Sequence, residues 1–263
     1  MMKHLKSIVI ASMCLVLTGA LALAQAKPKN QNLRVKGIKT VIAKMDAASK
    51  DKTRAVGEAF EVEEPDMSEN AQLEKSKARM CFYCGTVMME VMGKSIYNPV
   101  QADDPRTKKK VTAYFKRLKK MLRSVGIGEE TQTDLDVVIT AYQANSIEDL
   151  GAALEKLSGT IQDNLEEKLG PDAIWYYSLG YSAKGYKLAG QAKLYDMVSV
   201  IAPTPEDLLS YTPEKVDARI KTALTELSPV SQKNEDEIGP RDYALLKTRS
   251  TVILNSFRKG RAK

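Results

Sequence analysis

The sequence predicts an all-α protein, a bundle of about six to eight helices that follows a cleaved signal peptide. Three observations support this fold class. After residue 68, apolar residues recur every three or four positions over most of the chain, which is the period of an amphipathic helix. Residues that cap helices, and Gly or Pro residues that end them, separate these stretches. No segment reads convincingly as a strand, so we expect helices that pack on helices.

The N-terminal segment 1–26 has the pattern of a secretory signal peptide. A basic start precedes an apolar stretch over residues 7–24, and Ala24 and Ala26 offer small-residue cleavage sites. An uncleaved membrane anchor is the alternative, although the apolar stretch is short for one. No later segment is apolar for long enough to cross a bilayer. We therefore expect a periplasmic or secreted protein with no transmembrane span after cleavage.

Cleavage after Ala26 would also remove His4, the only histidine of the sequence. A mature chain without histidine excludes histidine acid–base catalysis, histidine zinc sites and histidine-ligated haem. The segment carries two lysines and no acid, so the formal net charge of +7 falls by two to +5. This mild basicity predicts local basic patches and no nucleic-acid binding. We expect a protein that is not an enzyme, although paired carboxylates leave acid–base catalysis open.

The mature chain is expected to have three parts. Residues 27–67 are rich in charge and poor in large apolar side chains, which is typical of a mobile segment. The helical domain is expected over residues 68–257. A short basic tail, 258–263, ends the chain.

Four helices are predicted in the first half of the domain, each from its own cap or stop signals. Ser146 opens a capping box and begins the fourth of them. Residues 160–169 either extend that helix or form a separate one. The expected elements are a helix over about 68–93, a helix over about 107–124, a third from Thr133 or Asp134, and the fourth from Ser146.

The second half of the domain begins at Gly170 and Pro171, which predict the end of one helix and the start of the next. The helix from Pro171 is expected to be the longest and to run to about Ile201. Another helix is expected over about 212–227, where Pro229 then follows, and a last one over about 241–257.

Sulfur-containing side chains gather on one side of the first predicted helix. Cys81, Cys84 and Met88 share a face at helical spacing, whereas Glu90 falls on the opposite, charged side. Two cysteines in an exported chain usually pair, so we predict a Cys81–Cys84 disulfide. The alternatives are buried reduced thiols, a thiol-exchange centre, and a Cu(I) site, because thiolate and thioether sulfurs select Cu(I). The metal ligands would be Met80, Cys81, Cys84 and Met88, and no other cofactor is expected.

The second predicted helix is strongly basic and amphipathic. Its segment from 108 to 123 contains eight basic residues and no acid, while Val111, Phe115, Leu118 and Leu122 fall on one face. Its basic face could bind an anionic lipid or a polyanionic glycan, or it could simply be solvated. The candidate anion-binding residues are Lys108, Lys109, Lys110, Lys116, Arg117, Lys119, Lys120 and Arg123.

The long helix from Pro171 carries small residues at intervals of four and three positions. Small side chains at this spacing allow another helix to approach closely, either within the chain or in a homo-oligomer. A tyrosine-lined groove for a ligand is the alternative. The proposed seam consists of Ser178, Ser182, Gly185, Ala189 and Ala192.

These observations favour an exported, non-enzymatic helical protein that binds a protein or an anionic component of the cell envelope. The alternative is a periplasmic Cu(I)-binding or thiol-active protein that uses Cys81 and Cys84.

Overall fold

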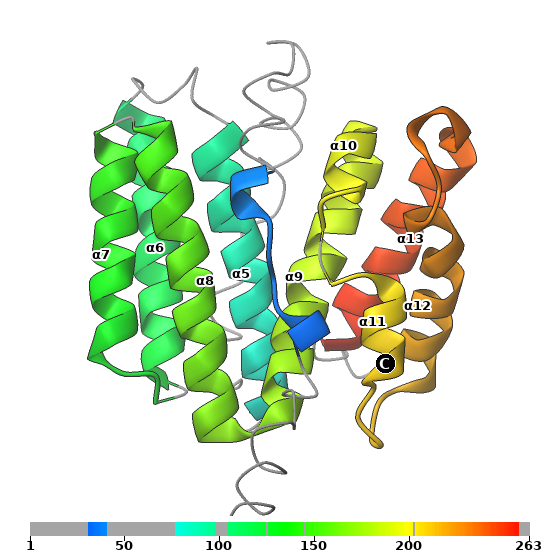
Figure 1. Cartoon of the computed structure of the whole chain (residues 1–263), viewed down its shortest axis with the longest axis horizontal. Helices are drawn as coiled ribbons and strands as arrows, with labels where there is room; N and C mark the ends of the chain where they lie inside the picture. Colours follow the sequence, from blue (N-terminus) through cyan, green and yellow to red (C-terminus); the bar gives the residue numbers. More distant parts are fainter. Residues whose placement is uncertain are drawn as a thin grey trace, which may run out of the picture. The chain divides into compact units, whose positions relative to one another are not determined.

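A computed structural model of the protein describes part of the chain, and its helices are labelled as in Figure 1. Nine α-helices, α5 to α13, lie wholly within the described residues, which contain no strand, and this confirms the all-α fold. Contacts within the chain divide it into two units, 1–32 and 33–263, and these nine helices all belong to the second. The expected signal peptide and basic tail lie outside the described residues, which are 31–40, 77–97, 105–124, 126–144, 146–201 and 203–257.

The first four helices form an antiparallel bundle. They are α5 (Lys77–Tyr97), α6 (Pro105–Ser124), α7 (Glu129–Gln143) and α8 (Ile147–Leu169). Each packs on the next in the chain, and α8 also returns to contact α5, which closes the bundle (Figure 1). Helices joined by short connections must pack as antiparallel neighbours, so the connectivity follows from the loop lengths.

Local signals explain where these helices begin and end. The Ser146 hydroxyl accepts a hydrogen bond from the Asp149 backbone N–H and caps α8, as the sequence predicts. Residues 160–169 extend α8 and do not form a separate helix. Gly170 ends α8 with a φ of 88°, a left-handed value that glycine adopts without strain.

The central element is α9 (Pro171–Ala192), which contacts α5, α8, α10, α11 and α13. Seventeen of its 22 residues are buried. A surface helix buries only one stripe, so burial around its circumference makes α9 the axis of this unit. Trp175 illustrates how its polar atoms are satisfied, because its indole N–H donates to the Leu208 carbonyl over 2.7 Å.

Glycines allow α9 to touch its neighbours at backbone distance. A Cβ on Gly85 of α5 would lie 1.9 Å from the Tyr177 carbonyl oxygen. A Cβ on Gly180 of α9 would lie 2.0 Å from the Phe82 carbonyl oxygen. At Gly190, a Cβ would lie 2.6 Å from the Tyr243 carbonyl oxygen of α13 (Pro240–Phe257). Any side chain larger than hydrogen would clash at these positions, so only glycine fits where α9 crosses α5 and where it crosses α13.

The remaining helices cover the other side of α9. They are α10 (Tyr195–Val198), α11 (Pro205–Ser210), α12 (Ala218–Ser231) and α13. Helices α12 and α13 pack together, and α13 lies along α9 (Figure 1). The two shortest helices, α10 and α11, raise the number of helices above the six to eight expected.

The prediction that the helix from Pro171 runs to about Ile201 is wrong. Helix α9 ends at Ala192, where Lys193 takes the left-handed conformation with a φ of 53°. The Leu194 backbone N–H then donates to the Ala189 carbonyl over 3.1 Å, a bond typical of a helix C-terminus. At 23 residues, α8 is slightly longer than α9.

Three other boundaries differ from the predictions. Helix α7 starts at Glu129, before the expected Thr133. Helix α12 starts only at Ala218, where the Asp217 carboxylate accepts the Arg219 N–H as a cap. Pro229 lies inside the last turn of α12 and does not stop it. A proline so close to a helix end removes one hydrogen bond but leaves the preceding turns intact.

Residues 33–38 belong to the segment expected to be mobile, yet they pack onto α8 and α9. Leu33, Val35 and Ile38 are buried. The Val35 backbone N–H donates to the Gln162 side chain over 2.8 Å. Arg34 pairs with Asp163 at 2.5 Å and with Glu166 at 3.1 Å. Burial of these three apolar side chains is sufficient to anchor a short segment, even though the neighbouring residues in the sequence are mostly polar.

Candidate functional site

The strongest candidate for a functional surface is the outer face of α6. Val111, Phe115, Leu118 and Leu122 are all buried against the bundle. They recur at intervals of three or four residues, so they form one stripe on the helix and leave the opposite stripe to solvent.

Four basic side chains line that solvent face. Lys109, Lys116, Lys120 and Arg123 are all exposed and recur at helical spacing, and we call them the basic stripe. From Lys109 to Arg123, a separation of 14 positions, the helix rises about 21 Å. Arg123 also donates to the Gln132 side chain over 2.7 Å. The basic stripe is a row of positive charges on a rigid element.

The other predicted anion-binding residues are placed differently. Lys119 is partly covered and pairs with Asp136 of α7 at 3.1 Å. Arg117 is only partly exposed. The side chains of Lys108 and Lys110 lie outside the described ones. Of the eight predicted residues, the four of the basic stripe share one exposed face.

Helix α7 gives the basic stripe an acidic border. It contains four carboxylates and no lysine or arginine. Glu129, Glu130 and Asp136 are exposed, whereas Asp134 is buried and pairs with Lys156 at 2.8 Å. Because α7 packs against α6, positive and negative charges lie on adjacent helices.

The predicted Cys81–Cys84 disulfide is wrong, because both cysteines are free thiols in the structure. Helix α5 runs without interruption through both positions. Side chains three residues apart in a regular helix point in directions about 60° apart, so a bond between them requires local distortion. The contact with α9 at Gly85 opposes that distortion.

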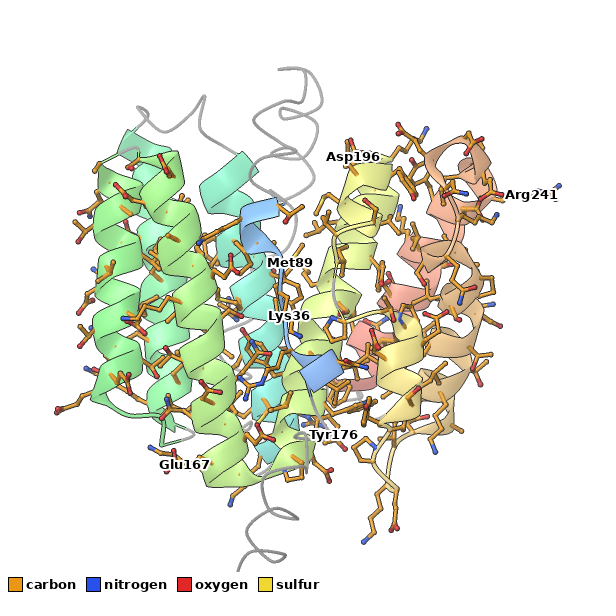
Figure 2. The ribbon with its side chains drawn as sticks, viewed as in Figure 1. Lys36, Met89, Glu167, Tyr176, Asp196 and Arg241 are labelled. Atoms are coloured by element: carbon orange, nitrogen blue, oxygen red, sulfur yellow. The ribbon has the colours of Figure 1, made fainter. Side chains whose placement is uncertain are left out.

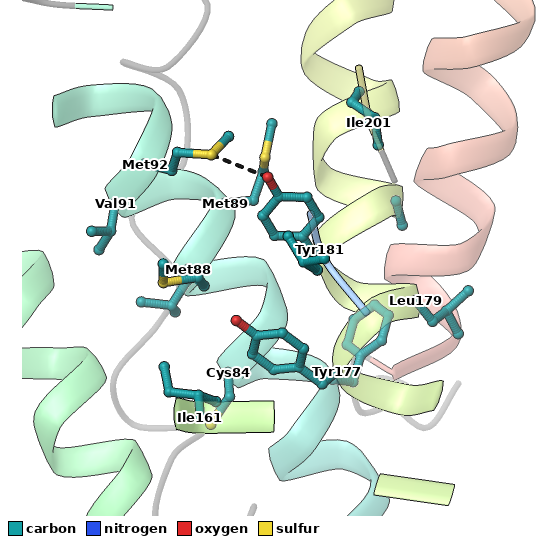
Figure 3. Packing of buried hydrophobic residues seen from close by; sticks show 14 of the residues in the cluster. Cys84, Met88, Met89, Val91, Met92, Ile161, Tyr177, Leu179, Tyr181 and Ile201 are labelled. Atoms are coloured by element: carbon teal, nitrogen blue, oxygen red, sulfur yellow. Dashed lines mark hydrogen bonds between the residues drawn. The ribbon is translucent and has the colours of Figure 1, made fainter. Parts of the chain in front are cut away.

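The sulfur-rich face of α5 belongs to the hydrophobic core. Met80, Cys81, Cys84 and Met88 are all buried. Figure 3 shows Cys84 and Met88 beside Tyr177, and the Tyr181 hydroxyl donates to the Met92 sulfur over 3.1 Å. Methionine sulfur fills gaps between aromatic rings well, so packing explains this composition.

Burial also makes the two thiols poor nucleophiles. It raises the pKa of Cys81 to about 12, and it raises the pKa of Cys84 well above its usual value, with the nearby Cys81 as a smaller cause. A thiol with a high pKa holds little thiolate, the form that attacks disulfides and binds metals. No group of three or more His, Cys, Asp or Glu side chains in the described residues could hold a metal ion. The Cu(I) hypothesis therefore stays a prediction.

The small residues of α9 lie mainly against other parts of the same chain. The Ser178 hydroxyl donates to the Leu33 carbonyl, and the Ser182 hydroxyl donates to the Pro203 carbonyl over 2.9 Å. A Cβ on Gly185 would lie 2.8 Å from Ile201. Met89 of α5 lies on this side of α9 as well (Figure 2). Ala189 is fully buried and Ala192 is partly buried.

A buried ion pair joins α5 to α9, and sequence reasoning missed it. Lys184 Nζ lies 2.7 Å from Glu90 Oε1, and each side chain is only 8% exposed. The sequence pattern assigns Glu90 to the outer side of its helix, but α5 is covered on that side too. The signal in the sequence is a charge placed among apolar and small residues on each helix: Glu90 within Met88–Met92, and Lys184 and Lys187 within Ala183–Leu188.

A shallow cavity of about 260 Å³ between α12 and α13 is a weaker candidate site. Its two arginines already have carboxylate partners, since Arg219 pairs with Asp217 and Arg249 pairs with Glu226. With its charges satisfied, this cavity offers no free cation to a ligand.

Comparisons with protein-family models, with curated proteins and with solved structures find no match for this chain. None of the described helices combines the length and the apolar character needed to span a membrane.

Proposed function

We propose that this protein is an exported, non-enzymatic helical protein that binds an anionic component of the cell envelope through the basic stripe of α6. The observation that carries the proposal is the alignment of Lys109, Lys116, Lys120 and Arg123 on one exposed face. Cationic side chains on a rigid helix attract an anionic surface at long range and bind it without reorganisation.

Two further observations support the proposal. The three lysines of the basic stripe have no carboxylate partner among the described residues, whereas Lys119 and Lys156 do. The signal-peptide pattern of residues 1–26 indicates a destination in the envelope or beyond it, where anionic lipids and anionic polymers are abundant.

Co-sedimentation of the exported protein with isolated cell envelopes tests this function. The stripe variant is Lys109→Gln, Lys116→Gln and Lys120→Gln. Each lysine close to an anionic surface contributes roughly 1 kcal/mol, so this variant should bind about 100-fold more weakly at low salt. Binding of the unmodified protein should also fall as salt rises.

The matched control removes three exposed lysines elsewhere. Lys215, Lys221 and Lys247 lie before α12, on α12 and on α13, and all three are exposed. Their replacement by Gln makes the same change in net charge, so it should leave most envelope binding intact. Equal losses in the two variants would mean that net charge alone drives binding and that the basic stripe has no specific role.

A further inference from the structure

We infer that the partner of the basic stripe is a single chain of a linear polyanion, such as a phosphate- or uronate-bearing polymer, and not a lipid bilayer. This inference rests on the proposed function and identifies its ligand class. Four features of α6 and α7 support it.

The first feature is the burial of the apolar face of α6. A helix that lies in a membrane interface inserts its apolar side chains among the lipids. Here Val111, Phe115 and Leu118 are no more than 1% exposed, because they pack inside the bundle. Among the described residues, Val137 of α7 is the only large hydrophobic side chain that is exposed. The described part of α6 exposes no large hydrophobic side chain that could anchor the protein in lipid.

The second feature is the acidic border on α7. A flat anionic bilayer in contact with α6 would also meet the neighbouring helix, where Glu129 and Asp136 are exposed. Carboxylates near an anionic surface are repelled, which opposes the attraction of the lysines. A narrow polymer can follow α6 alone and avoid α7.

The third feature is the geometry of the basic stripe. Its charges succeed one another along the helix axis at rises of about 10, 6 and 4.5 Å, from seven, four and three residues. A row of this kind matches successive charges of an extended polymer. An isolated small anion can contact only part of the row, because the row is about 21 Å long.

The fourth feature separates this polymer from a single-stranded nucleic acid. Proteins that bind single strands combine a basic track with exposed aromatic side chains, on which the bases stack. Phe115 is fully buried and Tyr114 is only partly exposed. The basic stripe offers charge without a stacking platform, so it suits a polyanion that has no bases.

Binding of two probes to the full-length exported protein tests the inference. One probe is inorganic polyphosphate and the other is a vesicle of phosphatidylglycerol in phosphatidylcholine. Release of condensed counterions from a flexible polyanion gives a slope of about −0.7 per neutralised charge in a plot of log K against log salt concentration. With four contacts, polyphosphate binding should be about 50-fold weaker when the salt concentration is raised fourfold. The stripe variant keeps only Arg123, so the same rise in salt should weaken its binding only about threefold.

A second variant separates the two ligands. Replacement of Glu129 by Gln removes part of the acidic border without touching Lys119 or its partner Asp136. Vesicle binding should rise strongly in this variant, whereas polyphosphate binding should change less than twofold.

The outcomes distinguish the inference from the function on which it rests. Polyphosphate binding with the expected salt slope, together with weak vesicle binding, supports the inference. Vesicle binding as tight as polyphosphate binding, and lost in the stripe variant, overturns the polymer inference but leaves the proposed function standing. If neither probe binds and envelopes do not bind either, the proposed function itself fails.

Discussion

Helices α6 and α9 place their lysines in opposite environments. In α6, Lys109, Lys116 and Lys120 are exposed on the outside of the bundle. In α9, Lys184 and Lys187 are 6% and 8% exposed. The difference arises because α6 covers one side of the bundle, whereas five other helices surround α9. The number of charged residues in a segment therefore does not indicate how strongly those charges affect the stability of the fold.

Under the proposed function, binding depends on α6 and stability on α9. A solvated charge loses almost no hydration when the chain folds, so the charges of α6 remain available to a partner at little cost in stability. A buried charge loses its hydration and must be compensated by its neighbours. Glu90 provides that compensation for Lys184, and the pair joins α5 to α9.

The largest expected effect comes from the buried pair itself. Lys184→Met leaves the Glu90 carboxylate in the core without its partner, and such a change costs about 3–5 kcal/mol in the free energy of unfolding. Urea denaturation followed by circular dichroism measures it. The double variant Glu90→Leu and Lys184→Met removes both charges and should recover most of the loss. Lys120→Met in α6 is the matched control and should have almost no effect.

If the Lys184→Met variant does not fold, the double variant still decides the point. A double variant as unstable as the single one would mean that Lys184 acts through its packing. The contrast between buried and exposed lysines would then not be electrostatic.

The next effect concerns the backbone contact between α5 and α9. Gly85→Ala would place a methyl group 1.9 Å from the Tyr177 carbonyl oxygen, so the two helices must move apart. Overpacking of this kind costs about 3 kcal/mol. Gly159→Ala in α8 is the control, since nothing lies within 4 Å of its Cβ position. That change should stabilise the protein by about 0.5–1 kcal/mol, because alanine favours the helix. Similar melting temperatures for the two variants would contradict the close crossing.

A smaller effect should appear at alkaline pH. Burial raises the pKa of Cys81 from its ordinary value of 9.0 to about 12, so the folded state holds this proton more tightly than the unfolded state. The stabilising contribution is complete below pH 9 and is lost as pH rises from 9 towards 12. Near pH 10 the loss from Cys81 should be on the order of 1 kcal/mol.

Urea denaturation at neutral and alkaline pH measures this loss in the protein and in Cys81→Ala. The Cys81→Ala variant should lose less stability than the unmodified protein when the pH is raised. The difference should equal the contribution of the Cys81 thiol. An identical pH dependence would show that Cys81 is not buried in the α5–α9 contact. Comparison of the two slopes cancels the titration of the exposed lysines, which both proteins share.

The sequence predicts the fold class well because the helical period and the caps are local signals. The Ser146 cap and the turn at Gly170 and Pro171 depend on a few adjacent residues, and the structure has both. The end of α9 has no such signal. Lys193 adopts a left-handed conformation that its residue type does not indicate.

Features that depend on which side of a helix is covered could not be predicted. A helical wheel assumes one buried face, so Glu90 is assigned to solvent, whereas α5 is buried almost all round. The same assumption works for α6, which does cover only one side of the bundle. The disulfide prediction failed for a related reason, since it used compartment and residue count but not the position of the cysteines within a continuous helix.

The smallest expected effect on stability comes from the basic stripe. Substitutions on an exposed helix face usually change the free energy of unfolding by less than about 0.5 kcal/mol. The stripe variant should therefore unfold at the same urea concentration as the unmodified protein, or slightly higher, because three like charges on one face repel each other. Its envelope binding should fall strongly in the same preparation. A stability loss above about 1 kcal/mol would instead tie these lysines to the fold, as Lys184 is tied, and the contrast between α6 and α9 would then not hold.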